Sequence, residues 1–183
     1  GVPPTDAPGV RGAMRPAPLP SNVPSALRTE ADVLGQDFAS AWNDHDAKAL
    51  SSLFAQDAAL AAPIHERAVG RADLERTFTR LHEGPMKASR MTTSVDSVRE
   101  LSSDLVLIDM SHAVTGITPQ DGQAAPPGLM RTHSIIVAQR EGKELRIREM
   151  RVTPRPMGPM QPGVGGSGDA GDQLPEDDSN LEN

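Results

Sequence analysis

The chain has 183 residues, a formal net charge of −7, no cysteine and only 2% aromatic residues, with one tryptophan and no tyrosine. Without cysteine, disulfides, thiolate metal sites and cysteine nucleophiles are excluded. An acidic chain with few aromatic side chains lacks the basic face and stacking surfaces of nucleic-acid binders. The sequence contains no run of about 18 apolar residues, so no membrane span is predicted.

The two ends of the chain differ in composition from the middle. Residues 1–28 hold seven of the 17 prolines, and residues 156–183 combine glycine, proline and acidic residues with few large apolar side chains. Such segments bury too little apolar area to offset their chain entropy. We therefore predict a disordered linker at 1–28, one domain at 29–155 and a disordered tail at 156–183.

The start of the chain bears on localisation. It consists of a glycine and then a proline-rich spacer, which suits a protein that follows a cleaved secretory signal or a lipoprotein anchor. We expect a secreted or periplasmic protein, either free or anchored as a lipoprotein after signal removal. A trimmed cytoplasmic protein would have a similar start.

The first half of the domain is predicted to be mainly helical. Apolar residues from Leu34 to Trp42 recur at helical spacing, and Asp46 precedes a second short helix whose first amides its carboxylate can cap. Next comes "AALAAPI", a short strand candidate that Pro63 limits to an edge or a bulge. A third helix, in "VGRADLERTFTRLHEGP", starts after Gly70 and stops at a Gly-Pro pair.

The second half is predicted to be strands. Four β-rich runs follow one another: "RMTTSVDSVREL", "DLVLIDMSHAVTGI", "LMRTHSIIVAQR" and "KELRIREMRVTP". In the second run His112 shares a face with Met110, and in the third His133 shares a face with Ile135. If these strands pair and their apolar faces coincide, both histidines look into the same interior. Helices followed by a meander of strands indicate an α+β fold.

The block "FASAWNDHDAKALSSLFAQDAAL" and the later "VGRADLERTF", "EGPMKASRMTTSVDSVRELSSDLVLI" and "THSIIVAQREGKELRIREMRVTP" carry a family resemblance. Over residues 29–155 the chain resembles the nuclear-transport-factor-2-like superfamily, in its SnoaL-like and SgcJ/EcaC-type group. The resemblance implies a cystatin-like cone: a curved antiparallel sheet packed with three N-terminal helices around a pocket open at one end. It also implies a homodimer formed through the outer surface of the sheet.

The superfamily includes ketosteroid isomerases, scytalone dehydratase, epoxide hydrolases and polyketide cyclases, together with members of no known chemistry, so the fold alone gives no function. Without tyrosine, this chain cannot supply the phenolic oxyanion donor of the isomerases. The sequence therefore leaves open whether the protein is an enzyme.

The candidate catalytic residues are His112 and His133 as proton carriers, with Asp57 as a possible partner. Each histidine can equally be a core residue, and Asp57 can equally serve a turn. Asp109 is expected on the outer face beside Arg131 or Arg148. The candidate ligand-binding side chains are Trp42, Phe54, Phe78, Met110, Ile135 and Met150.

The sequence favours a domain that binds a small apolar molecule in an interior pocket. The alternatives are an isomerase-, cyclase- or hydrolase-type enzyme that uses a pocket histidine and aspartate, and a homodimeric interaction domain. We expect neither a cofactor nor a metal, because two histidines without a third ligand do not make a metal shell. Arg71 is expected to clamp a carboxylate at the start of the third helix.

Overall fold

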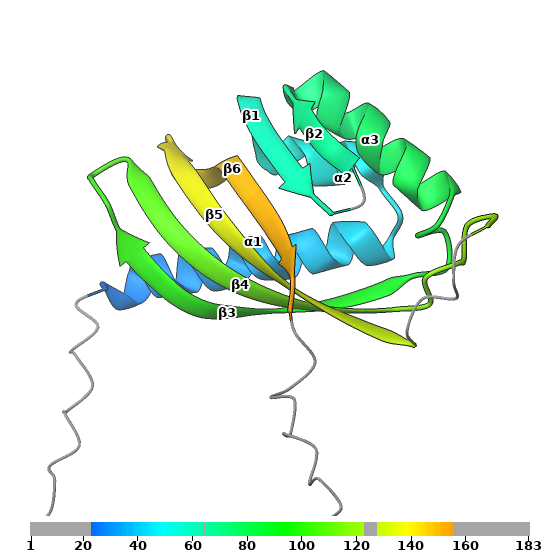
Figure 1. Cartoon of the computed structure of the whole chain (residues 1–183). Coiled ribbons are helices and arrows are strands. Elements are labelled where there is room, and N and C mark those ends of the chain that lie inside the picture. The colour runs from blue at the N-terminus through cyan, green and yellow to red at the C-terminus, as the bar shows by residue number, and fades with distance from the viewer. Residues whose placement is uncertain (1–22, 64, 123–127, 156–183) are drawn as a thin grey trace, which may run out of the picture.

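The computed structural model describes residues 23–63, 65–122 and 128–155 (Figure 1). The predicted linker up to residue 22 and the predicted tail from residue 156 lie outside the described residues. Within the described residues the chain forms three helices and six strands: α1 (Ser25–Asn43), α2 (Ala47–Ser52), β1 (Phe54–Ala62), β2 (His65–Val69), α3 (Arg71–Glu83), β3 (Arg90–Glu100), β4 (Leu105–Thr115), β5 (Leu129–Glu141) and β6 (Glu144–Pro154).

The first two helices follow their sequence signals. α1 begins after Pro24, slightly before the predicted domain boundary, and buries the apolar stripe that includes Leu34, Phe38 and Trp42. It ends where the chain turns through His45, whose φ is +53°. Asp46 then caps α2, because its carboxylate accepts a hydrogen bond of 2.9 Å from the amide of Ala49. The predicted capping role of Asp46 is confirmed.

α3 lies between two glycines, as predicted. Gly70 has a φ of +86°, a value that residues other than glycine rarely adopt, and Gly84 ends the helix. Arg71, the first residue of α3, donates two hydrogen bonds to the backbone oxygen of Phe54, at 3.1 and 2.7 Å. The guanidinium of Arg71 thus holds β1 against the start of α3, and it has no carboxylate partner among the described side chains.

The strands form one curved sheet in the order β2-β1-β6-β5-β4-β3. Five strands were expected from their composition, whereas β2 was not, and Pro63 lies in the turn that joins β1 to β2. All neighbours pair antiparallel except β1 and β6, which are parallel. The α+β class is thus confirmed, and the sheet is mixed because the last strand inserts beside the first.

The pairing of β4 with β5 fixes which side chains face inward. His112 lies opposite Thr132, and Ser111 lies opposite His133. Side chains directly opposite each other share a face, and successive residues alternate. The prediction that His112 and His133 face the same interior is therefore wrong: His112 points inward, and His133 points outward together with Ile135.

A bulge decides the orientation of the last strand. Ile147 pairs with Ala138, whereas Glu149 pairs with Val137, so Arg148 is an extra residue in β6. An extra residue resets the alternation of side chains. As a result Glu149 falls on the outer face of the sheet, opposite Val137.

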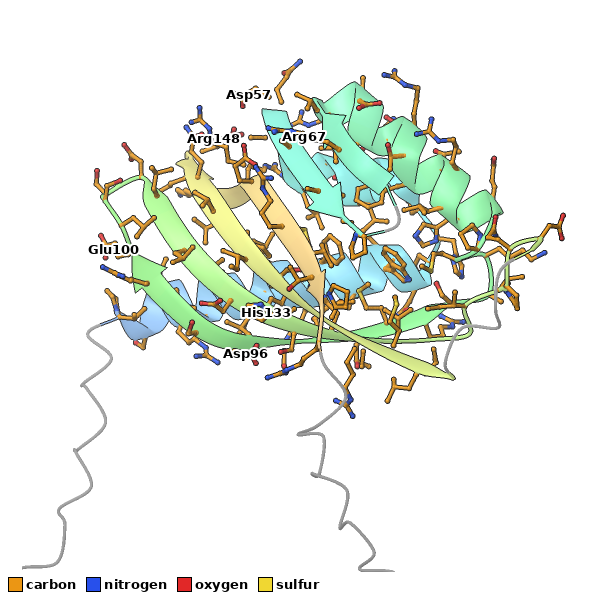
Figure 2. The ribbon with its side chains drawn as sticks, in the orientation of Figure 1. Asp57, Arg67, Asp96, Glu100, His133 and Arg148 are labelled. Carbon is orange, nitrogen blue, oxygen red and sulfur yellow. The ribbon has the colours of Figure 1, made fainter. Side chains whose placement is uncertain are left out.

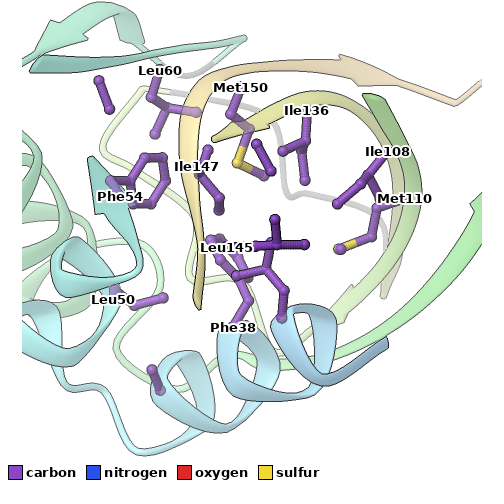
Figure 3. Close-up of a cluster of buried hydrophobic side chains, with 14 of the residues drawn as sticks. Phe38, Leu50, Phe54, Leu60, Ile108, Met110, Ile136, Leu145, Ile147 and Met150 are labelled. Carbon is purple, nitrogen blue, oxygen red and sulfur yellow. The ribbon is translucent and has the colours of Figure 1, made fainter. Parts of the chain in front are cut away.

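The core lies between α1 and the inner face of the curved sheet (Figure 3). In Figure 3, Phe38 and Leu145 point toward the same interior as Met110 and Ile136 from the neighbouring strands. At Gly35 the helix approaches the sheet closely: a Cβ there would lie 3.2 Å from Cε of Met110. This close approach lies in the middle of α1, where the hydroxyl of Thr93 in β3 also donates to the backbone oxygen of Gly35 at 2.8 Å.

Candidate functional site

A cavity of about 110 Å³ lies between α1, α3 and the inner face of the sheet, and we call it the inner cavity. It is bounded by side chains from both helices, from all strands except β2, and from the loops between them. The lining residues are Phe38, Trp42, Leu60, Ala62, Pro63, Phe78, Leu81, Met86, Met91, His112, Val114, Met130, Thr132, Met150, Val152 and Pro154.

The wall of the inner cavity is almost wholly carbon and sulfur. The ring of Phe38 is part of this wall, and its centroid lies 6.3 Å from that of Trp42 and 6.5 Å from that of Phe78. Four of the lining residues are methionines. Because thioether chains are flexible and polarisable, they adapt to ligands of different shape. Among the lining residues, only His112 and Thr132 have polar side-chain atoms besides the indole Nε1 of Trp42, which is already bonded to Ser89.

His112 is the one titratable side chain that lines the inner cavity among the described residues. It is 4% exposed, and its ring lies against that of Phe38 with centroids 5.9 Å apart. Burial, together with the nearby His133, lowers the pKa of His112 to about 4, although Asp96 opposes the shift. At neutral pH the imidazole is therefore uncharged.

The hydrogen bonds of His112 point to one tautomer. Its Nε2 lies 2.7 Å from the hydroxyl of the buried Ser134, and its Nδ1 has no partner among the described residues. If Nε2 carried the proton, the hydroxyl hydrogen of Ser134 and the lone pair of Nδ1 would both be unsatisfied. If Ser134 donates to Nε2, only the Nδ1 proton is unsatisfied, which costs less. His112 then keeps one unused hydrogen-bond donor.

The indole of Trp42 is fixed in place by a chain of hydrogen bonds. Its Nε1 donates to the hydroxyl of Ser89 at 2.9 Å, and that hydroxyl donates to the backbone oxygen of Met86 at 2.8 Å. All three residues are buried. Because the polar edge of the indole is satisfied, its apolar faces are left for packing against the cavity and α1.

A second pair of histidines stands behind Trp42, and sequence reasoning missed it. Nδ1 of His45 lies 2.7 Å from Nδ1 of His82, and the ring of His82 meets Trp42 edge-on with centroids 4.5 Å apart. Burial and the adjacent His45 lower the pKa of His82 to about 4. The two residues lie 37 positions apart, so only the packing of α3 against the end of α1 brings them together.

The predicted ligand-binding residues are divided between the cavity wall and the core. Trp42, Phe78 and Met150 line the inner cavity. Phe54 and Met110 are buried beside it without lining it. These positions follow the helical and strand periodicities that picked the residues out.

The other predicted residues lie on the outside (Figure 2). Ile135 is 45% exposed on the outer face. His133 lies 3.1 Å from Asp109, which also accepts a hydrogen bond from Ser97. The expected placement of Asp109 on the outer face is therefore right, but neither predicted arginine is its partner: the partners are His133 and Ser97.

Asp57 also lies away from the inner cavity. Its side chain is 72% exposed and stands 3.6 Å from Arg148, at the exposed edge that Figure 2 shows near Arg67. The structure brings Asp57 together with neither predicted histidine: His112 is buried on the inner face, and Figure 2 shows His133 well apart from Asp57. Gln56 and Asp57 are exposed within β1, between the buried residues Ala55 and Ala58.

Among residues 23–63, 65–122 and 128–155 no group of three or more metal-ligating side chains converges. In the same part of the chain, no helix is long and apolar enough to cross a membrane. The arrangement around the inner cavity can therefore do two things with the residues present. It can enclose an apolar molecule, and it can give or take one hydrogen bond through the neutral His112.

Comparison with solved structures shows the same fold in proteins of low sequence identity. A domain of unknown function with a cystatin-like fold from Nostoc punctiforme is 18% identical, with a TM-score of 0.62, 74% of this chain and 81% of that chain covered. A ketosteroid isomerase-like protein from Erwinia carotovora is 13% identical, with a TM-score of 0.56 and coverage of 69% and 94%.

A hexachlorocyclohexane dehydrochlorinase of type 2 is also similar in structure, at 13% identity and a TM-score of 0.58, with 76% of this chain and 97% of that chain covered. No curated protein matches the chain by sequence. The model of the SnoaL-like domain matches residues 36–150, which span α1 to the middle of β6. The chain therefore belongs to the SnoaL-like domain family of the nuclear-transport-factor-2-like superfamily.

Proposed function

We propose that this protein binds a small, uncharged and largely apolar molecule in the inner cavity, with His112 as its polar contact. One observation carries the proposal: a cavity lined by aromatic and thioether side chains contains a single buried histidine that is neutral at pH 7. Apolar walls with few polar groups are typical of small-molecule sites. A charged ligand would find no counter-ion there.

The volume limits the ligand. At about 110 Å³, the inner cavity is somewhat smaller than the engineered apolar cavity of about 150 Å³ that binds benzene. We therefore expect a ligand of about one ring, or a larger one if the methionines change rotamer. The unused donor on His112 favours a ligand with one acceptor atom, such as a carbonyl oxygen.

A second candidate function is catalysis of a proton transfer, favoured by the same neutral imidazole. With a pKa of about 4, His112 is neutral at pH 7. To act as a base on a ligand it must take the other tautomer, with the proton on Nε2 and a free lone pair on Nδ1. A catalytic site usually brings at least two polar groups to one point. Among the described residues, His112 is the only titratable group at the inner cavity, and Thr132 forms no hydrogen bond with it. We therefore place binding first.

The test uses two probes that differ at one position, cyclohexanone and its isostere methylenecyclohexane. The ketone has a carbonyl oxygen where the hydrocarbon has a CH₂ group. We expect both to raise the melting temperature and to change the fluorescence of Trp42, which is the only tryptophan of the chain and lines the cavity. The ketone should bind more tightly by about 1 kcal/mol, the net value of one hydrogen bond.

Two matched variants locate the binding. Val152→Phe places a larger side chain at the partly buried lining and should weaken both probes at least tenfold, about 1.4 kcal/mol. Val33→Phe adds the same bulk at a position that is 47% exposed on α1 and should leave both affinities unchanged. If both variants bind the probes as the original protein does, the inner cavity is not the site.

An interaction domain is the third candidate, and the exposed Ile135 on the outer face favours it. A homodimer formed through this face would cover Ile135 and needs a total buried area of about 1,000 Å² or more. Native mass spectrometry of the full chain tests it. A dimer that Ile135→Glu converts to a monomer supports the interface, and a monomeric original protein refutes it.

A further inference from the structure

The outer face of the sheet carries a polar groove of about 140 Å³, which we call the outer groove. Its lining residues come from three neighbouring strands, β3, β4 and β5, and from Arg155, the residue after β6. Thr92, Ala113 and Arg131 lie side by side across β3, β4 and β5, and Ser94 lies beside Ser111. Because the small Ala113 stands in the middle of this row, the groove has a low floor between longer side chains.

Two guanidinium groups flank the outer groove. Arg155 donates from Nη1 to the hydroxyl of Ser111 at 2.9 Å, and its backbone amide bonds to the oxygen of Arg131 at 2.9 Å. Both arginines are exposed. Neither forms an ion pair with a carboxylate of the described residues, whereas most of the other arginines on the sheet do so.

The nearest acidic side chains already have partners. Asp96 accepts a hydrogen bond from Ser111, and Asp109 is held by Ser97 and His133. No acidic residue lines the outer groove itself. Two arginines and the hydroxyls of Thr92 and Ser94 therefore face an open space that can take an anion. Guanidinium groups bind carboxylates with paired, charge-assisted hydrogen bonds.

The chain itself supplies carboxylates close by. Residues 156–183 hold six acidic residues, from Asp169 to Glu182, and neither lysine nor arginine. This segment leaves the described part of the molecule at Arg155, which is a wall of the outer groove. A glycine-rich linker, such as the sequence predicts for this segment, spans about 5–6 Å times the square root of its residue number. The acidic residues can therefore return to the groove without extending the chain fully.

We propose that the outer groove binds the acidic segment 169–182 of the same chain. The proposal does not depend on what the inner cavity binds. Tethering favours this occupant because a segment on a short flexible linker has an effective concentration of about 1 mM or more. A free anion at a lower concentration competes poorly with this segment for the outer groove. The carboxylates of the segment can also replace one another as partners of the two arginines.

The absence of cysteine makes a sharp test possible. Ser179→Cys gives the full chain a single thiol, to which a nitroxide spin label is attached for NMR. We expect the amide signals of Thr92, Ser94 and Ala113 to lose about half of their intensity or more, as for a contact with Kd near the effective concentration. At about 1 M salt, where the Debye length is about 3 Å, the signals should recover.

Matched charge changes identify the partners. Arg131→Gln with Arg155→Gln should restore the three signals, because both guanidinium groups are removed. Arg76→Gln with Arg80→Gln removes two arginines from the exposed face of α3 and should leave the loss of intensity as it is. If the groove variant keeps the loss, or the label broadens no groove amide, the proposal is overturned.

Two further outcomes separate other occupants. Labelled protein without ¹⁵N is mixed with ¹⁵N-labelled protein that has no spin label. Loss of groove signals in this mixture means that the segment comes from a second copy, which overturns the assignment to the same chain. Shifts caused by inorganic phosphate in the original protein, without any effect of the spin label, mean a small-anion site and also overturn it. Loss of groove signals only when one chain carries both ¹⁵N and the spin label, and not in the mixture, supports the proposal.

Discussion

The two faces of the β4–β5 pair place the same side-chain type in opposite surroundings. On the inner face, His112 is 4% exposed, bonded only to Ser134 and neutral at pH 7. On the outer face, one residue away in register, His133 is half-buried and lies 3.1 Å from Asp109. The sheet thus separates an apolar interior, where the histidine is neutral, from an outer face where the other histidine has a carboxylate partner.

The comparison teaches that the face decides the role of a residue here. Ile108 and Ile135 are both isoleucines of these two strands, yet one is completely buried and the other is 45% exposed. A side chain on the inner face shapes the inner cavity and the core. A side chain on the outer face meets water, the outer groove or a partner.

The largest effect expected from this difference is on stability. Ile108→Ala removes a fully buried side chain and should lower the free energy of unfolding by about 2–5 kcal/mol, because a cavity is left behind. Ile135→Ala should cost less than about 1 kcal/mol. Urea denaturation of the two variants measures both values. Equal losses would mean that the outer face is covered in solution.

A smaller effect is expected on the pH dependence of stability. His112 has a folded pKa of about 4, whereas an unfolded histidine has about 6.5. Between these pH values the histidine binds a proton in the unfolded state but not in the folded state. The free energy of unfolding therefore falls as the pH falls from 6.5 to 4. The loss from this residue is about 3 kcal/mol.

The double variant His112→Phe with Ser134→Ala tests this without leaving the serine hydroxyl unpaired. Its loss of stability between pH 6.5 and 4 should be smaller than that of the original protein by about 3 kcal/mol. His133→Gln on the outer face is the control and should keep most of the loss through His112, because burial is the larger cause of its lowered pKa and the nearby His133 the smaller. An unchanged slope in the double variant would show that His112 is accessible to protons.

The smallest effect is expected at the outer pair. Asp109 and His133 are each about one-third exposed, so their coupling should be about 0.2–1 kcal/mol. A double-mutant cycle with Asp109→Asn and His133→Gln measures it, and added salt should reduce it. A coupling of several kcal/mol would indicate that this face is shielded from water, as in a dimer.

The sequence predicted most elements because their signals are local. Asp46 caps α2, glycines enclose α3, and four strand-like runs became β3 to β6. The short β2 carries too few residues for a pattern, and it exists because β1 offers it a partner. Local periodicity therefore gave the helices and long strands, and pairing between distant segments gave the rest.

The candidate site was predictable only in part for the same reason. Trp42 and His112 follow from the regular alternation and spacing of their elements. In β5, however, Ile135, Ile136 and Val137 are consecutive apolar residues, so either face could have been the inner one. Only the register with β4 turns Ile136 inward. The contact of His45 with His82 has no local signal at all.

The position of β6 between β1 and β5 also sets the order in which this domain can be completed during synthesis. β1 and β2 are made early, but the strand that joins them to the remaining sheet is made last. Joining segments that are distant in the chain is an entropically slow step. A nascent chain that lacks β6 exposes the edges of β1 and β5, so it depends on the finished C-terminal strand to escape pairing with other chains.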